Sequence, residues 1–193
     1  MEAYSAGQRD FGENRAQEAL AKQPDCAADI TWHFIGHLQS NKAKQVPGAF
    51  AYVHSVDSIR LAEALNRHAL AAGTTLRVLL QANLTGESSK SGIVAAEDLA
   101  GLLRATLIYP ALRPVGLMTL PDPAYSEAQT RKVFAGLRTL LDELRSTCGA
   151  GQDFCELSMG MSHDFEWAIL EGATFVRIGT AIFGERTPRR ILK

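Results

Sequence analysis

The order of apolar and polar residues along the chain alternates between two periods. Short runs rich in β-branched, aromatic and aliphatic side chains predict strands, and longer stretches with apolar residues three and four positions apart predict helices. The predicted strands are residues 9–13, 31–35, 51–56, 76–82, 114–118, 154–158 and 174–178. The predicted helices are residues 14–22, 40–46, 58–72, 94–107 and 163–171, with a long helix between the fifth and sixth strands.

The long helix carries the clearest periodic signal. Its apolar residues fall at spacings of three and four, which places them on one face; they are Val133, Phe134, Leu137, Leu140, Leu141 and Leu144. Strands that alternate with helices in this way predict parallel pairing through right-handed crossovers. An open doubly wound sheet is the alternative, but the glycine-rich turn expected after an early strand of that fold is missing.

The number of strands favours a barrel over its alternative. Seven strands follow a fragment of helix at residues 2–6, and a TIM-type (β/α)8 barrel would need one more strand ahead of Met1. The prediction is therefore an α/β barrel with its first strand absent, formed by one incomplete domain over residues 1–193. Residues 186–193 are basic, contain Pro188 and are expected to form a loose tail.

Composition excludes several classes of function. The 193 residues carry a formal net charge of −1, which argues against nucleic acid as a partner. Three cysteines without C-x-x-C spacing argue against a disulfide framework or a zinc site, and they favour the cytoplasm. Neither a secretory signal nor a run long enough to cross a bilayer is present in the sequence, so no membrane partner is expected.

Two loops have the chemistry of a phosphate site. In a barrel, such sites favour the loops after the last two strands, which here are residues 159–162 and 179–181. Gly160 and Gly179 let a ligand approach the backbone, and Ser158, Ser162 and Thr180 add hydroxyl donors. In the alternative interpretation Ser162 is an ordinary helix N-cap and Gly179 makes a turn. Two loops of the same chemistry favour the phosphate site.

The charged candidates leave more alternatives open. Arg177, on the last strand, is equally suited to contact a ligand or to pair with Glu13 or Glu156. His37 follows a strand and is expected to face the site. Its H-x-x-x-H spacing with His33 suits a metal only when both residues lie on one helix, so no metal is expected.

Other candidates fit surface positions better than the site. His54 and His68 are expected at the surface or at a sheet edge. Lys90 lies in a polar loop near the rim of the barrel, where a solvated lysine is favoured over a ligand. No hydrolase triad, P-loop or pair of carboxylates is evident.

Several segments together resemble the YggS/PROSC family of pyridoxal-phosphate homeostasis proteins. The matching segments are residues 11–14 (FGEN), 33–42 (HFIGHLQSNK), 54–57 (HSVD), 90–93 (KSGI), 116–118 (GLM), 157–162 (LSMGMS) and 177–184 (RIGTAIFG). They occur in family order over almost the whole chain. The resemblance implies a barrel of the alanine racemase N-terminal kind that binds pyridoxal 5′-phosphate without an established turnover. Its expected partners are this cofactor and the pyridoxal-phosphate-dependent apo-enzymes that would receive it.

The resemblance also implies roles for single residues. Ser158, Ser162, Gly179 and Thr180 would hold the phosphate, together with Met159 and Gly160 of the same loop. Arg177 would lie near the cofactor ring, Asn14 and His37 would line the pocket, and Lys90 would lie near its mouth. In the family, a Schiff-base lysine lies on a strand upstream of the segment matched by residues 11–14, and here it would precede Met1. No catalytic residue is therefore assigned. A racemase or decarboxylase-like enzyme and an inert truncated fragment remain alternatives.

Overall fold

The structure is a computed structural model, and it describes residues 2–86 and 91–184. Seven strands pair in parallel, each with the next in sequence, to form one sheet. The strands are β1 (Asp10–Glu13), β2 (Thr31–Phe34), β3 (Tyr52–Val56), β4 (Leu76–Gln81), β5 (Leu112–Met118), β6 (Glu156–Met161) and β7 (Phe175–Arg177). All seven predicted strands are therefore confirmed, with shifts at their ends. Lys90 and the expected tail at residues 186–193 lie outside the described residues.

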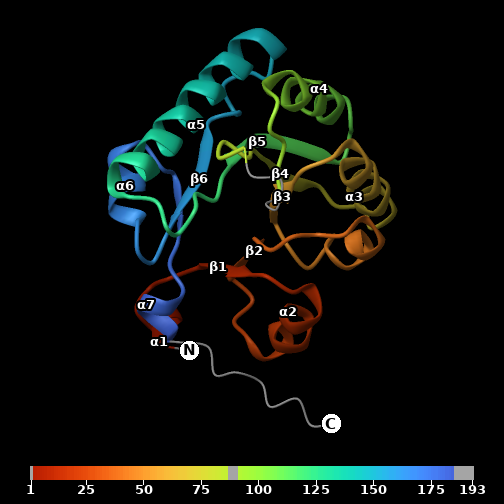
Figure 1. Cartoon of the computed structure of the whole chain (residues 1–193). Coiled ribbons are helices and arrows are strands. Elements are labelled where there is room, and N and C mark those ends of the chain that lie inside the picture. The colour runs from red at the N-terminus through yellow and green to blue at the C-terminus, as the bar shows by residue number, and fades with distance from the viewer. Residues whose placement is uncertain (1, 87–90, 185–193) are drawn as a thin grey trace, which may run out of the picture.

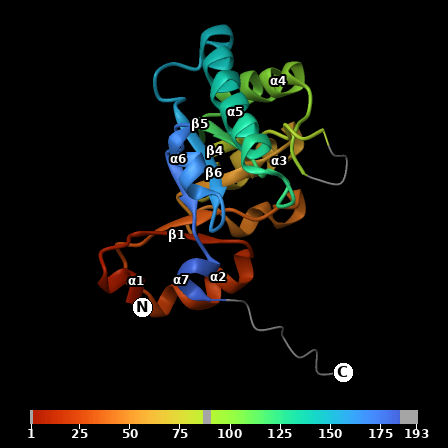
Figure 2. The same ribbon diagram turned by 60° about the vertical axis from the view of Figure 1, so that its left-hand side comes forward.

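Helices connect the strands and lie around the outside of the sheet (Figure 1). They are α1 (Glu2–Ser5), α2 (Ala16–Lys22), α3 (Ile59–Ala71), α4 (Ala96–Leu107), α5 (Glu127–Cys148), α6 (Phe165–Leu170) and α7 (Thr180–Phe183), with 3₁₀ helices η1 (Gln23–Asp25) and η2 (Ser40–Gln45). The view in Figure 2 shows α1, α2 and α7 gathered at one end of the molecule, near β1.

The long helix α5 illustrates how the sequence determines these elements. Ser126 and Gln129 form a reciprocal capping box at its start, and Gly149 ends it in the left-handed conformation with φ of 68°. The apolar face predicted from the periodicity is buried except for Leu140, which is partly buried, and Phe134 and Leu137 are fully covered. Burying this face against the sheet is the main source of the helix's stability in the fold.

Contacts across the interior show that the sheet curves into a nearly closed barrel. The ring of Phe175 on β7 lies 5.4 Å from the ring of His33 on β2 and 5.5 Å from the ring of Tyr52 on β3. Strands β2 and β3 are far from β7 in the order of the sheet, so these contacts require the sheet to bend round on itself. Among the described residues, β1 and β7 are the two edge strands. The barrel prediction is confirmed.

Strand β6 is longer at its carboxyl end than predicted, and this corrects one expectation. Residues 159–161 were expected in a loop, but the strand continues to Met161. Gly160 has φ of 92°, and the pairing register between β6 and β7 shifts between Ser158 and Met161. A glycine in this conformation is typical of a bulge, which lengthens one strand relative to its partner.

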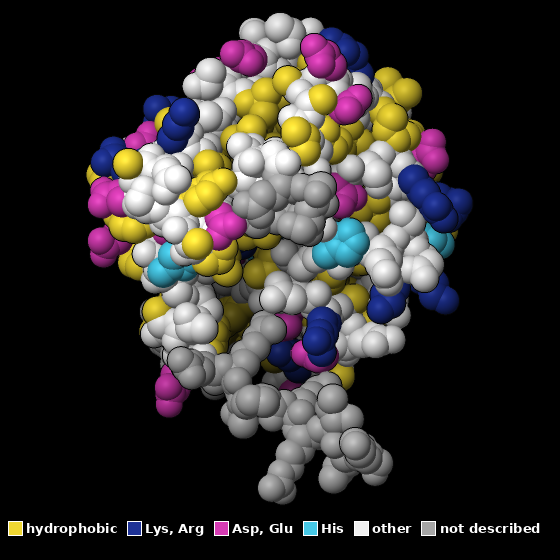
Figure 3. Space-filling model, viewed as in Figure 1, with side chains coloured by type: hydrophobic (Ala, Val, Ile, Leu, Met, Phe, Trp, Pro, Cys, Tyr) yellow, Lys and Arg dark blue, Asp and Glu magenta, His cyan; other side chains and the backbone are white. Residues whose placement is uncertain are grey.

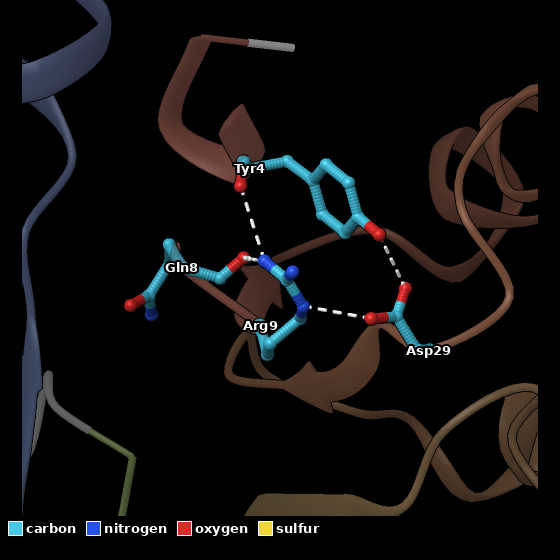
Figure 4. Close-up of polar contacts among 4 residues, drawn as sticks. All are labelled: Tyr4, Gln8, Arg9 and Asp29. Carbon is cyan, nitrogen blue, oxygen red and sulfur yellow. Dashed lines mark hydrogen bonds and ion pairs between the residues drawn. The ribbon is translucent and has the colours of Figure 1, made fainter. Parts of the chain in front are cut away.

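The chain reaches β1 through a small polar cluster (Figure 4). Arg9 donates a hydrogen bond from Nε to Asp29 at 2.7 Å, and its guanidinium lies 4.0 Å from the centre of the Tyr4 ring. Tyr4 donates its hydroxyl hydrogen to the other oxygen of Asp29. Arg9 also donates to the backbone carbonyls of Tyr4 and Gln8. The cluster fixes α1 against the segment before β2.

Candidate functional site

The predicted rim residues lie at the carboxyl ends of their strands. Asn14 follows β1, His37 comes soon after β2, and Gly179 follows β7. Because all strands are parallel, these positions share one end of the barrel. Gly36, just before His37, is required by close packing: a Cβ atom there would lie 2.3 Å from the carbonyl oxygen of Asn14. The sequence therefore brings the first two rim loops into contact.

The loops after β6 and β7 converge on one oxygen atom. The backbone N–H groups of Gly179 and Ala181 donate to the hydroxyl oxygen of Ser162, at 3.0 and 3.4 Å. The expectation that the two loops lie together is confirmed. The alternative in which Ser162 is the N-cap of the next helix is wrong, because Asp164 occupies that position. Two amides aimed at a single oxygen make an arrangement that suits an oxyanion.

The surroundings of these amides are open. Gly179 and Thr180 are exposed, and a Cβ atom on Gly179 would meet nothing within 4 Å. Met159 and Gly160, by contrast, are buried within β6. A Cβ atom on Gly160 would lie 2.6 Å from the side chain of Ala168, so this glycine permits close packing of α6 on the strand. The accessible part of the predicted set is thus Ser162, Gly179 and Thr180.

Arg177 lies in the barrel interior, next to this rim. Its Nη1 donates to the hydroxyl oxygen of Ser158 at 2.5 Å, and its Nη2 donates to the carbonyl oxygen of Thr119 at 2.9 Å. Burial lowers the pKa of the guanidinium to about 10, and the nearby Asp164 carboxylate opposes that shift. The alternative of an ion pair with Glu13 or Glu156 is wrong: Glu13 pairs with Lys22, and both hydrogen-bond partners of Arg177 are neutral.

A buried series of hydrogen-bonded side chains, the hydrogen-bond chain, continues from Ser158 across the interior. The Ser158 hydroxyl lies 2.8 Å from Nδ1 of His54, and Nε2 of His54 lies 2.9 Å from Nδ1 of His33. The hydrogen-bond chain ends at Asp10, whose carboxylate lies 3.0 Å from Nε2 of His33. It therefore links β7, β6, β3, β2 and β1.

Both histidines of this chain are buried, with exposed fractions of 1% for His54 and 4% for His33. Burial is the main reason why the pKa of His54 falls well below its usual range, and the charges of His33 and Arg177 add to the effect. Burial also lowers the pKa of His33, although its hydrogen bond to Asp10 and the Asp10 charge oppose the shift, while the Arg77 charge lowers it further. Both rings are therefore neutral at neutral pH.

The expectation that His54 lies at the surface or at a sheet edge is wrong. The sequence did contain a usable signal, because His54 falls inside a predicted strand of a barrel. In such a strand one face meets the interior and the other meets the helices, so neither face is open to water. The chain Asp10–His33–His54 was thus a site feature that sequence reasoning missed.

His37 is exposed at the rim, unlike the buried Arg177 and Ser158. Its Nδ1 lies 3.3 Å from the hydroxyl of Ser91 and 3.6 Å from the carboxylate of Asp57. These contacts join the loops after β2, β3 and β4 at the rim. No group of three or more metal-ligating side chains occurs in the described part of the chain.

A hollow of about 640 Å³ lies away from this rim. It is lined by residues that precede or begin β2, β3 and β4, among them Ile30, Ala51 and Thr75. It therefore opens at the amino ends of the strands, where active sites of β/α barrels are not found. Figure 3 shows a face on which apolar, acidic and basic side chains are intermixed. None of the described helices is both long and apolar enough to span a bilayer.

The fold and the rim define a β/α barrel protein with an oxyanion-suited site at the ends of its last two strands. Residues 1–187 match the family model for the N-terminal domain of alanine racemase. A pyridoxal phosphate homeostasis protein of Pseudomonas aeruginosa is 50% identical over 186 residues, which cover 96% of this chain and 78% of that protein. The chain belongs to the alanine racemase N-terminal domain family and, within it, to the pyridoxal phosphate homeostasis proteins.

Solved structures agree with this assignment. PipY of Synechococcus elongatus, determined with pyridoxal phosphate bound, superposes with a TM-score of 0.88 at 42% identity, covering 95% of this chain and 85% of that one. Alanine racemase of Corynebacterium glutamicum superposes with a TM-score of 0.73 at 17% identity, covering 95% of this chain and 50% of the enzyme. The second likeness shows the shared barrel alone.

Proposed function

We propose that this protein binds pyridoxal 5′-phosphate at the carboxyl ends of β6 and β7 and helps to maintain the supply of that cofactor. The observation that carries the proposal is the convergence of the Gly179 and Ala181 amides on one oxygen, that of Ser162. Phosphate oxygens also accept hydrogen bonds and, unlike a hydroxyl oxygen, carry negative charge. The structure of PipY with this cofactor bound, at 42% identity, supports the choice of ligand.

The residues present fit the cofactor's phosphate. The Gly179 and Ala181 amides and the hydroxyls of Ser162 and Thr180 would donate to it, and the open backbone at Gly179 leaves space for it. Hydrogen bonds to a charged acceptor are about twice as strong as those between neutral groups. Met159 and Gly160 would support this site through the shape of β6 and would not touch the phosphate directly.

The remaining residues would surround the pyridine ring. Arg177 would present its positive charge from the interior, and Asn14 and His37 would close the pocket from the first two rim loops. The cofactor supplies an aldehyde that reacts with amines. The chain's own residues would hold it by its phosphate and ring and restrict its exposure to solvent. Lys90 remains a predicted contact near the mouth.

We infer that the protein stores and releases the cofactor and does not catalyse a reaction. Relatives at 42–50% identity carry the name of a homeostasis protein. The recipients would be pyridoxal-phosphate-dependent apo-enzymes. The likeness to alanine racemase is limited to the fold, so it does not favour racemisation.

The test compares two ligands that differ only in the phosphate. Pyridoxal 5′-phosphate and pyridoxal are titrated into the wild-type protein and into Ser162→Ala, and binding is followed by the fluorescence of Trp32 and Trp167 and by cofactor absorbance. We expect the wild type to prefer the phosphorylated ligand. In Ser162→Ala that preference should fall about tenfold, because one hydrogen bond to a charged group is lost. Equal affinity of the wild type for both ligands would refute the proposal.

A further inference from the structure

The hydrogen-bond chain from Arg177 to Asp10 has a defined donor-to-acceptor direction, which follows from the chemistry of its members. An ionised carboxylate only accepts hydrogen bonds, so Nε2–H of His33 donates to Asp10. In neutral His33 the other nitrogen, Nδ1, then accepts, and Nε2–H of His54 is its donor. Nδ1 of neutral His54 accepts in turn, so the Ser158 hydroxyl donates to it. Arg177, which has no acceptor, donates to the Ser158 oxygen.

This direction fixes the role of Ser158. Its single hydrogen is used on His54, and its oxygen accepts from Arg177. Ser158 is also fully buried, so it has no hydrogen to offer to a phosphate. Its structural position instead makes it the group that holds one branch of the Arg177 guanidinium, while Thr119 holds the other.

The two imidazole rings are themselves held in place by aromatic neighbours. The ring of Tyr52 stacks on His33 with centres 4.3 Å apart and planes within 4° of parallel. The ring of Phe175 meets both histidine rings in edge-to-face geometry, with ring centres 5.4 and 5.3 Å apart. The charged groups near the chain are Asp10, Arg77, Arg177 and Asp164. Neither ring can turn without losing these contacts as well as its hydrogen bonds.

We propose that His54 and His33 are positioning residues of the cofactor site, which fix the Arg177 guanidinium through the Ser158 hydroxyl and connect it to the Asp10 carboxylate. The proposal rests on the proposed function, since it assigns Arg177 to the ring side of the bound cofactor. The hydrogen-bond chain acts only on the ring side of the cofactor. The phosphate donors on the loops after β6 and β7 are separate from it.

The first test uses the wild-type protein without ligand. Nitrogen-15 NMR of the histidine side chains reports which ring nitrogen carries the hydrogen. We expect both His33 and His54 to be neutral with the hydrogen on Nε2. A charged ring, or a hydrogen on Nδ1 of either histidine, would overturn the proposal. This measurement is independent of whether the protein binds pyridoxal phosphate.

The second test removes the hydrogen bonds that His54 makes to Ser158 and His33. His54→Phe keeps a ring but loses both hydrogen bonds, His54→Asn keeps an acceptor near the position of Nδ1, and His68→Phe on α3 is the control. In protein labelled at arginine nitrogens, we expect the Arg177 guanidinium signals to shift and broaden in His54→Phe, less in His54→Asn, and not at all in the control. Unchanged signals in a folded His54→Phe protein would refute the proposal.

Ligand binding then separates this proposal from the proposed function. We expect His54→Phe to bind pyridoxal 5′-phosphate about tenfold more weakly and pyridoxal weaker by the same factor, so that the preference for the phosphate is unchanged. Ser162→Ala should change the preference. If the wild type binds neither ligand, the proposed function fails while the NMR result still stands. If the wild type binds and His54→Phe binds equally well, the positioning role fails alone.

Discussion

Arg9 and Arg177 place the same guanidinium group in two opposite environments. Arg9 is partly exposed, pairs with the Asp29 carboxylate and lies against the Tyr4 ring, as Figure 4 shows. Arg177 is buried, with an exposed fraction of 8%, and its hydrogen bonds go to a hydroxyl and a carbonyl. An exposed ion pair contributes little to stability, whereas a buried charge with neutral partners carries a desolvation cost. The desolvation cost supports the proposal that Arg177 serves the ligand site, whereas the contacts of Arg9 join α1 to the segment before β2.

The largest effect is expected when each arginine is replaced by methionine and cofactor affinity is measured. Arg177→Met should weaken pyridoxal 5′-phosphate binding about 10- to 100-fold, because a hydrogen bond to a charged group contributes about 1.5–3 kcal/mol. Arg9→Met should leave the affinity unchanged. Fluorescence titration of both variants gives the comparison. Equal losses would show that Arg177 acts through the fold and not through the ligand.

An intermediate effect, on the free energy of unfolding, is expected when the pH is lowered. The pH range of this effect differs between the buried histidines and the cluster of Tyr4, Arg9 and Asp29. His33 and His54 have folded pKa values below their ordinary value of 6.5, so below that pH the unfolded chain binds more protons than the folded chain. The free energy of unfolding should therefore fall as pH drops below 6.5, by up to about 1.4 kcal/mol per pH unit for each histidine.

The pKa of Asp29 is also lowered, chiefly by its hydrogen bond from Tyr4, from an ordinary value of 3.8. Its stabilising contribution is present above that value and is lost only as the pH falls below it. Urea unfolding at a series of pH values measures both windows. His54→Phe should flatten the slope below pH 6.5, and Asp29→Asn should leave that slope intact. A flat wild-type curve between pH 6.5 and pH 5 would contradict the buried neutral histidines.

The smallest effect is expected for Arg9→Met on stability. The Arg9–Asp29 pair is exposed and screened by salt, so the melting temperature should change by no more than a degree or two. The difference from wild type should shrink further in high salt. Calorimetry at low and high salt measures it. A large, salt-independent loss would mean that the cluster contributes far more to the stability of the fold than an exposed ion pair does.

Much of the fold could be predicted because the strands differ so clearly in period from the helices between them. The convergence of the loops around Ser162 and Gly179 was also predictable, since both follow neighbouring parallel strands. The extension of β6 to Met161 was not, because Gly160 looks like a loop residue until its bulge is seen. The burial of His54 was predictable, because both faces of a barrel strand are covered, but a period of two cannot show which of the two faces meets the interior.

The hydrogen-bond partners of Arg177 could not be predicted from the sequence, for a different reason. Glu13 and Glu156 were reasonable partners by charge, but the hydroxyl of Ser158 and the carbonyl of Thr119 are closer across the curved sheet. Such contacts depend on how far the sheet bends, and neighbouring residues in the chain do not determine that curvature. The roles of the predicted site residues in binding the cofactor stay predictions.

The Ser162 hydroxyl is expected to lower the affinity of the proposed site for small inorganic anions. It already satisfies the Gly179 and Ala181 amides, so a lone sulfate or phosphate ion would gain only the difference between its own bonds and those that it displaces. A larger phosphorylated molecule that also reaches the barrel interior would gain further contacts there, for example with Arg177. Small inorganic anions are therefore expected to compete poorly with the proposed cofactor for these backbone amides.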